Sequence, residues 1–216
     1  MRRVVFVIVD LAGYTALTEA HGGDGAATTV ARYRDLAERA LADGARIVEQ
    51  VGDELLIVAA EARAAMMTAI AIRAAVDAEP RFPGVRIGVA DGPVVERDGR
   101  YFGPALNLTA RLAARARPDE ILCTATVAGA CRDMTDVTVR DLGALRFKNV
   151  PEPVIVFAVV SEPPHRAGTA LDPVCRMHVA PATAPATLLL GGTTHYFCSE
   201  ACARSFAGSP ESYLLL

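Results

Sequence analysis

The 216-residue sequence lacks an apolar run long enough to cross a membrane, and it lacks a large excess of charge of either sign. The apolar stretch Val4–Val9 ends at Asp10 and is too short for a signal peptide or a transmembrane helix. The net charge of −3 gives no reason to expect nucleic acid or an anionic membrane as a partner. We therefore predict a cytoplasmic protein that binds neither.

Lysine and cysteine are also scarce. Lys148 is the only lysine among 22 basic residues, a mild indication of a selected position that chance would also explain. Five cysteines in a cytoplasmic chain favour a metal site or buried thiols over disulfides. Cys123 and Cys131 fall in predicted core segments, so we expect these two to be buried and not to bind a metal.

The composition predicts a globular chain of one or two domains, with 52% hydrophobic and 22% charged residues. The segment SEPPHRAGTA has the composition of a linker. We therefore divide the chain into a domain over residues 1–160, a linker over 161–170 and a small domain over 171–216. The small domain is too short to build a large hydrophobic core unaided.

Predicted strands and helices alternate without strict βαβ order, which favours an α+β domain with helices on a mainly antiparallel sheet. Asp91–Gly99 is typical of a turn-rich connection, His21–Gly25 of a glycine-rich loop, and Thr15 of a helix N-cap. The predicted strands span residues 3–9, 45–58 as a hairpin, 85–89, 101–102, 120–123, 137–146 and 154–160, and the predicted helices span 26–43, 61–78, 104–114 and 124–130.

Two aspartates stand where predicted strands end. Asp10 closes the first apolar strand, and Asp53 follows Gly52 at the turn of the predicted hairpin. Two carboxylates at neighbouring strand ends make a site for a hard divalent cation such as Mg²⁺. Because Asp favours turns in general, each residue could also be a plain turn residue.

Asn107 and Arg111 are four residues apart in a predicted helix, which places them on one helical face. They could act together on a ligand, or they could simply form the solvated face of an amphipathic helix. Backbone N–H groups at the helix start near Thr15 could cradle phosphates.

Four segments, in this order, resemble the class III nucleotidyl cyclases, the adenylate and guanylate cyclase family. They are FVIVDLAGYTAL, VEQVGDELLIV, DGRYFGPALNLTARL and LGALRFKNVPEPVIVF, and the resemblance covers about residues 3–160. It implies the nucleotide cyclase fold, a ferredoxin-like, mainly antiparallel sheet with covering helices. It also implies conversion of a nucleoside triphosphate to its 3′,5′-cyclic monophosphate and pyrophosphate.

The resemblance assigns roles to individual residues, with two Mg²⁺ or Mn²⁺ ions in each active site. It also implies a homodimer in which metal ligands and transition-state residues come from different subunits, so that one chain alone completes no site. The residues are Asp10, Asp53 and the Leu11 carbonyl for the metals, Asn107 and Arg111 for the transition state, Lys148 for the terminal phosphates, and Gly13, Tyr14 and Thr15 at the phosphate-binding turn.

The sequence departs from the family at the positions that select the purine. Adenylate cyclases have Lys four residues before the hairpin Asp and Asp or Thr three residues before the Gly of YFG; here these are Glu49 and Arg100. A carboxylate accepts from guanine N1–H and N2–H₂, and Arg donates to O6, so this pair favours GTP over ATP. Glu49 and Arg100 could instead form an ion pair that fills the pocket.

The C-terminal segment resembles the YHS domain, a small cysteine-containing, treble-clef-like module related to metal-handling domains. Cys175, Cys198 and Cys202 could bind Zn²⁺ or Cu⁺, with the set completed by His195, His178 or Asp172. The three thiols could also be small buried hydrophobes. Two other functions therefore remain open for the whole chain: a non-catalytic nucleotide-binding sensor, and a metal-handling protein that uses the YHS module.

Overall fold

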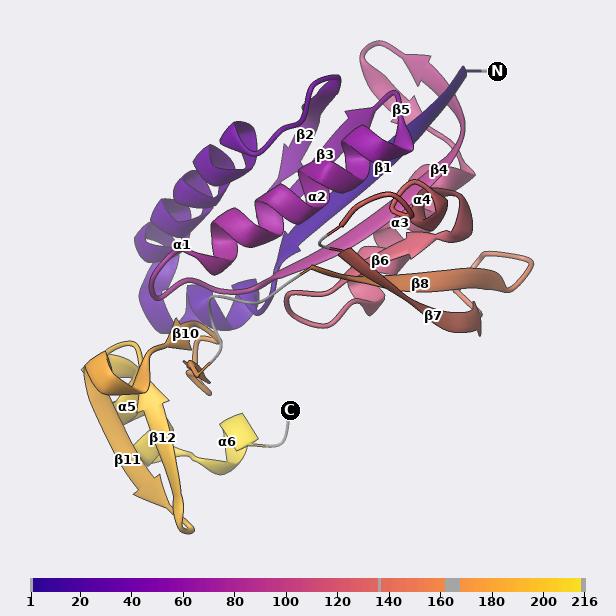
Figure 1. Ribbon diagram of the computed structural model, residues 1–216. Helices are drawn as coiled ribbons and strands as arrows, with labels where there is room; N and C mark the ends of the chain where they lie inside the picture. Colours follow the sequence, from indigo (N-terminus) through magenta and orange to yellow (C-terminus); the bar gives the residue numbers. More distant parts are fainter. Residues whose placement is uncertain (1, 136, 162–167, 215–216) are drawn as a thin grey trace.

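The computed structural model describes residues 2–135, 137–161 and 168–214. A large sheet with its helices is joined to a smaller unit at the C-terminal end (Figure 1). The predicted linker over 161–170 lies largely outside the described residues, and the predicted domain boundaries remain predictions.

The large sheet has eight described strands in the order β2-β3-β1-β4-β6-β8-β7, with β5 paired to β4. All pairs are antiparallel except β4 with β6, so the predicted mainly antiparallel α+β class is confirmed. The strands are β1 Arg2–Leu11, β2 Ala45–Val51, β3 Glu54–Ala59, β4 Val85–Arg97, β5 Arg100–Phe102, β6 Ile121–Thr124, β7 Val137–Leu145 and β8 Val154–Ser161.

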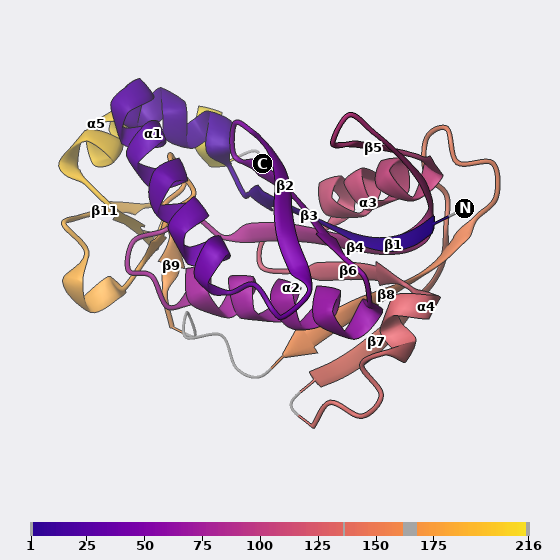
Figure 2. The same ribbon diagram turned by 90° about the horizontal axis from the view of Figure 1, so that it is seen from above.

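The central strand β1 is apolar on both faces because helices cover both sides of it. Val5, Val7 and Val9 face a core that includes side chains of α1 and α2, whereas Phe6 and Ile8 face a core shared with α3. Figure 2 shows α2 and α3 on opposite sides of β4 and β6. The described helices that accompany the large sheet are α1 Tyr14–Arg39, α2 Ala62–Asp77, α3 Pro104–Arg115 and α4 Ala125–Gly129.

The start of α1 differs from the prediction. Gly13, in a left-handed conformation with φ of 85°, precedes the helix without a side-chain cap, and Thr15 lies inside the first turn. The prediction of Thr15 as the N-cap was therefore wrong. The predicted loop His21–Gly25 is helical except at Gly22, whose φ of 70° and ψ of 176° break the helix into two parts. Glycine is well suited to this break because it adopts positive φ without steric cost.

The predicted turn-rich connection Asp91–Gly99 was also wrong, since β4 continues to Arg97. Residues 85–94 of β4 pair with β1, from Leu11↔Val85 to Arg2↔Val94, and residues 95–97 pair with β5. Ladder hydrogen bonds on these neighbours satisfy the backbone and override the local turn preference of Asp and Gly.

A close approach of α3 to β4 makes Gly88 the position most sensitive to added volume. A β-carbon there would overlap the Thr109 carbonyl oxygen and lie 2.5 Å from the Ala113 amide nitrogen. We expect Gly88→Ala to lower the free energy of unfolding by about 1–3 kcal/mol or more, because the helix backbone must move. Denaturant unfolding measures this. Gly129→Ala is the control, since a β-carbon there meets nothing within 4 Å; equal stability of the two variants would contradict the prediction.

The described part of the smaller unit has two short antiparallel strand pairs, followed by the helices α5 and α6. Phe197 and Phe206 form the centre of its core, with ring centroids 5.3 Å apart. The treble-clef-like description remains a prediction. The elements are β9 Ala170–Leu171, β10 His178–Val179, the 3₁₀ turn η1 Pro181–Thr183, β11 Ala186–Leu190, β12 Thr193–Phe197, α5 Glu200–Gly208 and α6 Glu211–Leu214. None of the described helices is long and apolar enough to span a bilayer.

Candidate functional site

Asp10 and Asp53 meet at one end of the large sheet. β1 pairs with β3 up to Val9↔Leu55, so Asp10, the next residue of β1, lies beside the β2–β3 turn that carries Asp53. Burial raises the pKa of Asp53 to about 7, together with a hydrogen bond to Asp10 and its negative charge. The backbone amide of Leu11 also interacts with the Asp53 carboxyl. The structure thus brings together the two carboxylates that sequence predicted.

One cation and one buried hydroxyl adjoin this carboxylate pair. Arg86 of β4, opposite Asp10 in the strand register, forms an ion pair with it. The Tyr33 hydroxyl donates to the Val9 carbonyl at 3.0 Å, and burial, followed by the charges of Asp10 and Asp53, raises the Tyr33 pKa well above its usual value. Two neighbouring carboxylates repel each other when both are ionised, and a bound cation would relieve that repulsion. Because their ligand atoms are oxygens, the pair suits a hard divalent cation such as Mg²⁺.

Glu54 is a third carboxylate of this region that sequence reasoning missed. Burial raises its pKa first, and the negative charges of Asp10 and Glu49 add to the effect. Its position directly after Asp53, at the start of β3, was the available signal. The negative charges of four acidic residues are therefore close enough to affect one another: Asp53 and Glu54 each interact with Asp10, and Glu54 also interacts with Glu49.

A cavity of about 190 Å³, which we call the β2–α3 cavity, is lined by two of these acidic residues. Glu49 and Glu54 line it from the hairpin, and Asn107 lines it from α3. The rest of the wall is apolar. Those side chains are Ile8, Val51, Leu56, Leu106 and Ala110.

A second cavity, of about 620 Å³, lies at the N-terminal turn of α3 and is called the α3 N-terminal cavity. Asn107 also lines this space, so one side chain contributes to both cavities. Asn149–Pro151, directly after Lys148, form the opposite wall. Lys148 itself is exposed beside this wall.

Arg111 and Arg100 line neither cavity, and the same is true of Lys148 and of the Asp10–Asp53 pair. Arg111 is exposed one turn further along α3 than Asn107. Arg100 is exposed at the start of β5, where it pairs with Arg97 across the hairpin. Between the described side chains of Glu49 and Arg100 the structure forms no ion pair, so they do not close the pocket against each other in this chain.

Gly13, Tyr14 and Thr15 follow Asp10 and Leu11 directly and form the entry to α1. The Leu17 amide donates to the Gly13 carbonyl at 2.9 Å, which closes the first turn of the helix. The earlier amides of a helix have no partner within it, and such amides can bind an anion. Arg176 of the smaller unit packs against Gly13, where an added β-carbon would lie 2.7 Å from the Arg176 side chain.

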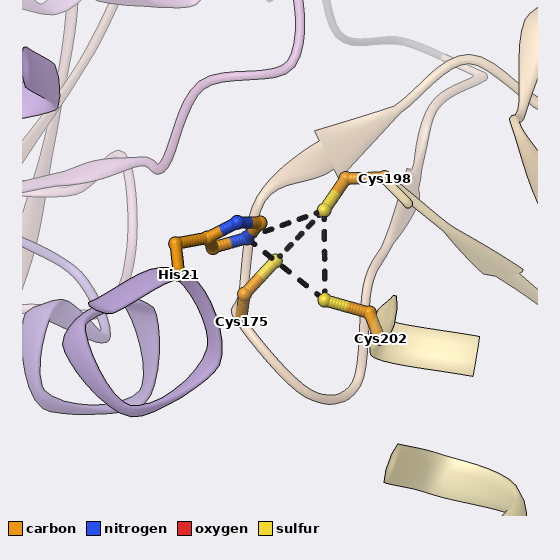
Figure 3. Close-up of side chains that lie close together, drawn as sticks. All are labelled: His21, Cys175, Cys198 and Cys202. Atoms are coloured by element: carbon orange, nitrogen blue, oxygen red, sulfur yellow. Dashed lines mark hydrogen bonds between the residues drawn. The ribbon is translucent and has the colours of Figure 1, made fainter. Parts of the chain in front are cut away.

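A second cluster joins the two units (Figure 3). Cys175, Cys198 and Cys202 are buried, and their sulfur atoms and one ring nitrogen of His21 all lie within 4.8 Å of one another. Hydrogen bonds with Cys175 and Cys198 lower the pKa of Cys202, and the charge of His21 contributes. Three sulfurs and an imidazole nitrogen are a common ligand set for Zn²⁺.

The fourth member of this cluster corrects the prediction. His195 lies against Phe206, with ring centroids 4.9 Å apart, and His178 lies 3.4 Å from Asp119. Asp172 is buried and accepts backbone hydrogen bonds. His21 takes the place that sequence reasoning gave to these three residues; it is 177 positions from Cys198. No local spacing pattern could have linked the two.

The fold is that of a nucleotide cyclase catalytic domain joined to a small cysteine-containing domain. A crystal structure of an adenylate/guanylate cyclase/hydrolase from Silicibacter pomeroyi is 31% identical, with 75% of this chain and 98% of that chain covered and a TM-score of 0.65. The adenylyl cyclase CyaB from P. aeruginosa, at 22% identity and a TM-score of 0.63 with 74% and 95% covered, shares the fold. The chain belongs to the adenylate/guanylate cyclase family, and residues 170–215 match the YHS domain model.

Curated relatives agree with this assignment. The pH-sensitive adenylate cyclase of Mycobacterium tuberculosis is 30% identical over 132 residues, which are 61% of this chain and 33% of the relative. The adenylate cyclase of Glutamicibacter nicotianae is 32% identical over 125 residues, 57% of this chain and 31% of the relative. The chain thus spans about a third of the length of these relatives.

Proposed function

We propose that this chain cyclises a purine nucleoside triphosphate to its 3′,5′-cyclic monophosphate, with release of pyrophosphate, in intracellular signalling. The observation that carries the proposal is the meeting of Asp10 and Asp53 in a domain of the cyclase family, next to Glu54, which lines the β2–α3 cavity together with Asn107. A cytoplasmic location and the division into residues 1–160, 161–170 and 171–216 belong to the same proposal.

Asp10, Asp53 and the Leu11 carbonyl are the groups that would hold two Mg²⁺ or Mn²⁺ ions. The fit rests on the donor set, since all are oxygen ligands and the two carboxylates are close enough to disfavour joint ionisation. When bound, such ions lower the pKa of the ribose 3′-hydroxyl and neutralise the polyphosphate.

The chain's own side chains position the substrate. The 3′-hydroxyl loses its proton to water, its oxygen attacks the α-phosphorus in line, the bond to the pyrophosphate oxygen breaks, and negative charge develops on the α-phosphoryl oxygens. Asn107, at the junction of the two cavities, orients the ribose; Arg111 stabilises the developing charge; and Lys148 binds the terminal phosphates. Amides of Tyr14 and Thr15 add donors for phosphate oxygens.

A homodimer with shared active sites completes the proposal. Arg111 and Arg100 are exposed in this chain and need a second surface to act on. Val95 and Phe102 form a cross-strand pair on the β4–β5 hairpin and are 50% and 53% exposed. Exposed apolar side chains of this kind are typical of a protein interface.

The acidic side of the β2–α3 cavity supports GTP as the preferred nucleotide. Glu49 and Glu54 offer acceptors to guanine N1–H and N2–H₂, whereas the edge of adenine offers one amino donor. Arg100 is exposed and does not line this cavity, so it would contact guanine O6 only if dimer formation brought it close to the bound base.

We expect purified protein with Mn²⁺ or Mg²⁺ to turn over GTP at least about tenfold faster than ATP at equal concentration, since one unmatched buried hydrogen bond costs about 1–3 kcal/mol. Glu49→Lys combined with Arg100→Asp should shift the preference towards ATP. Product is quantified by chromatography. Glu38→Lys, which repeats the Glu49→Lys substitution alone on the exposed face of α1, is the control for that half of the double variant. A wild-type preference for ATP would overturn the assignment of GTP, and absence of any product would overturn the proposed activity.

A further inference from the structure

The cluster of His21, Cys175, Cys198 and Cys202 lies where the YHS domain meets the first part of α1 (Figure 3). We propose that these four residues bind one Zn²⁺ ion, and that the ion, ligated by both domains, holds α1 residues Tyr14–His21 in place. Any effect of the ion on catalysis rests on the proposed cyclase function, because this segment begins at the predicted phosphate-binding turn. The zinc site itself does not depend on that function.

The spacing of the four ligand atoms fits a tetrahedral ion. Cys198 Sγ lies 3.3 Å from Cys175 Sγ and 3.7 Å from Cys202 Sγ. His21 Nε2 lies 3.5 Å from Cys198 Sγ and 3.9 Å from Cys202 Sγ. Zn–S bonds of about 2.3 Å and Zn–N bonds of about 2.1 Å in a tetrahedron place sulfurs about 3.8 Å apart and sulfur and nitrogen about 3.6 Å apart. Small adjustments would therefore admit the ion.

Backbone hydrogen bonds fix the cysteines before any ion binds. The buried Asp172 carboxylate accepts from the amides of Val174 and Cys198, both at 2.8 Å, and thereby joins the two loops that carry Cys175 and Cys198. Ser199 caps α5 by accepting from the Cys202 amide at 3.2 Å. Hydrogen bonds that orient the ligands in this way, made by residues that do not themselves bind the ion, are typical of metal sites in proteins.

The participation of His21 favours Zn²⁺ over Cu⁺. Three thiolates alone can satisfy Cu⁺, a soft ion, whereas structural Zn²⁺ almost always takes four ligands. In this chain the fourth ligand comes from the cyclase domain, which makes the site complete only when the two domains are docked. A cysteine set confined to the YHS domain would not have this property.

The two domains also touch outside the cysteine cluster, and one of these contacts reaches the predicted phosphate-binding turn. Ala20, next to His21, packs against the YHS core, and Arg176, next to Cys175, packs against Gly13. The His178 amide donates to the Phe82 carbonyl at 3.2 Å. The break at Gly22 separates this first part of α1 from the longer second part, so a ligand at His21 acts on the short segment that starts at the phosphate-binding turn.

Zinc binding by the full chain tests the site. We expect one Zn²⁺ per wild-type chain, measured by elemental analysis, and visible absorption of tetrahedral thiolate-bound Co²⁺ after substitution. His21→Ala should weaken Zn²⁺ binding by more than about 100-fold, since even outer partners of zinc ligands contribute about 10–100-fold. His195→Phe, which keeps a ring against Phe206, is the matched control and should bind as the wild type does. Unchanged affinity in His21→Ala would overturn the proposal.

Hydrogen exchange tests the link to α1. Without nucleotide or Mg²⁺, removal of Zn²⁺ should speed amide exchange over Tyr14–His21 in the wild type, while α2 stays unchanged. In His21→Ala the same segment should exchange rapidly with or without Zn²⁺. Equal protection of Tyr14–His21 in the zinc-bound and zinc-free wild type would contradict the inference. Cyclic nucleotide yield is a separate readout: its absence would end the proposed function and leave the zinc and exchange results interpretable.

Discussion

Asp53→Asn is expected to lower cyclic nucleotide production by at least about 10²–10³-fold, the loss that follows removal of one preorganised electrostatic partner from an active site. Asn cannot replace a charged oxygen ligand of a divalent cation, although it keeps nearly the same volume. The measurement is product formation under saturating nucleotide and Mn²⁺, with wild type and variant purified in parallel.

Asp43→Asn is the matched control for this substitution. Asp43 also adjoins a glycine of positive φ, Gly44, but it stands at the opposite end of β2 from Asp53.

A structural role for Asp53 can be separated from a functional one by thermal unfolding of the metal-free proteins. Asn removes a carboxylate that burial and Asp10 disfavour in its charged form, so we expect Asp53→Asn to unfold at no lower temperature than the wild type. Wild-type turnover in Asp53→Asn would contradict the assignment of the metal site.

The parts of the fold that sequence predicted well are those determined by neighbours along the chain. The apolar run Val4–Val9 predicts a strand buried on both faces, and Gly52 between two apolar runs predicts the β2–β3 hairpin; both are present. α3 was also predicted almost to its ends, because Pro104 marks its first turn and its apolar spacing is regular.

The failures are positions where distant partners decide the structure. Asp91–Gly99 contains turn-forming residues, yet pairing with β1 and β5 makes most of it strand. The loop expected at His21–Gly25 is helical because only Gly22 departs from helical geometry. Local propensity is a weak predictor wherever a strand or helix gains its stability from tertiary contacts.

The candidate sites show the same division. Asp10 and Asp53 could be paired from sequence because each stands at a strand end. His21 could not be assigned to the cysteine cluster, since the contact depends on how the YHS domain docks against α1. Glu54 was overlooked although it follows Asp53 directly. It lines a cavity that forms between the hairpin and α3, and the sequence does not show that these two elements are neighbours.

The second prediction with a large expected effect tests whether each active site is formed by two chains of a dimer. Arg111→Ala, like Asp53→Asn, is expected to reduce product by about 10²–10³-fold, because Arg111 would stabilise charge on the α-phosphate. If metal ligands and Arg111 act across a two-fold axis, a heterodimer of the two variants contains one fully wild-type site and one doubly altered site. The two chains are produced together with different affinity tags, and the heterodimer is purified through both. Its turnover should be about half that of the wild-type dimer.

Co-production of Asp53→Asn with Asp10→Asn supplies the control for this rescue. Both substitutions alter the metal half of the site, so every site in that heterodimer carries one damaged metal ligand and no activity should return. Sites contained within single chains would predict no recovery in either heterodimer, because each chain would carry its own defect. Recovery confined to the Asp53→Asn and Arg111→Ala pair would therefore require that the active site form between two chains, with the exposed face that carries Arg111 turned towards the carboxylates of its partner.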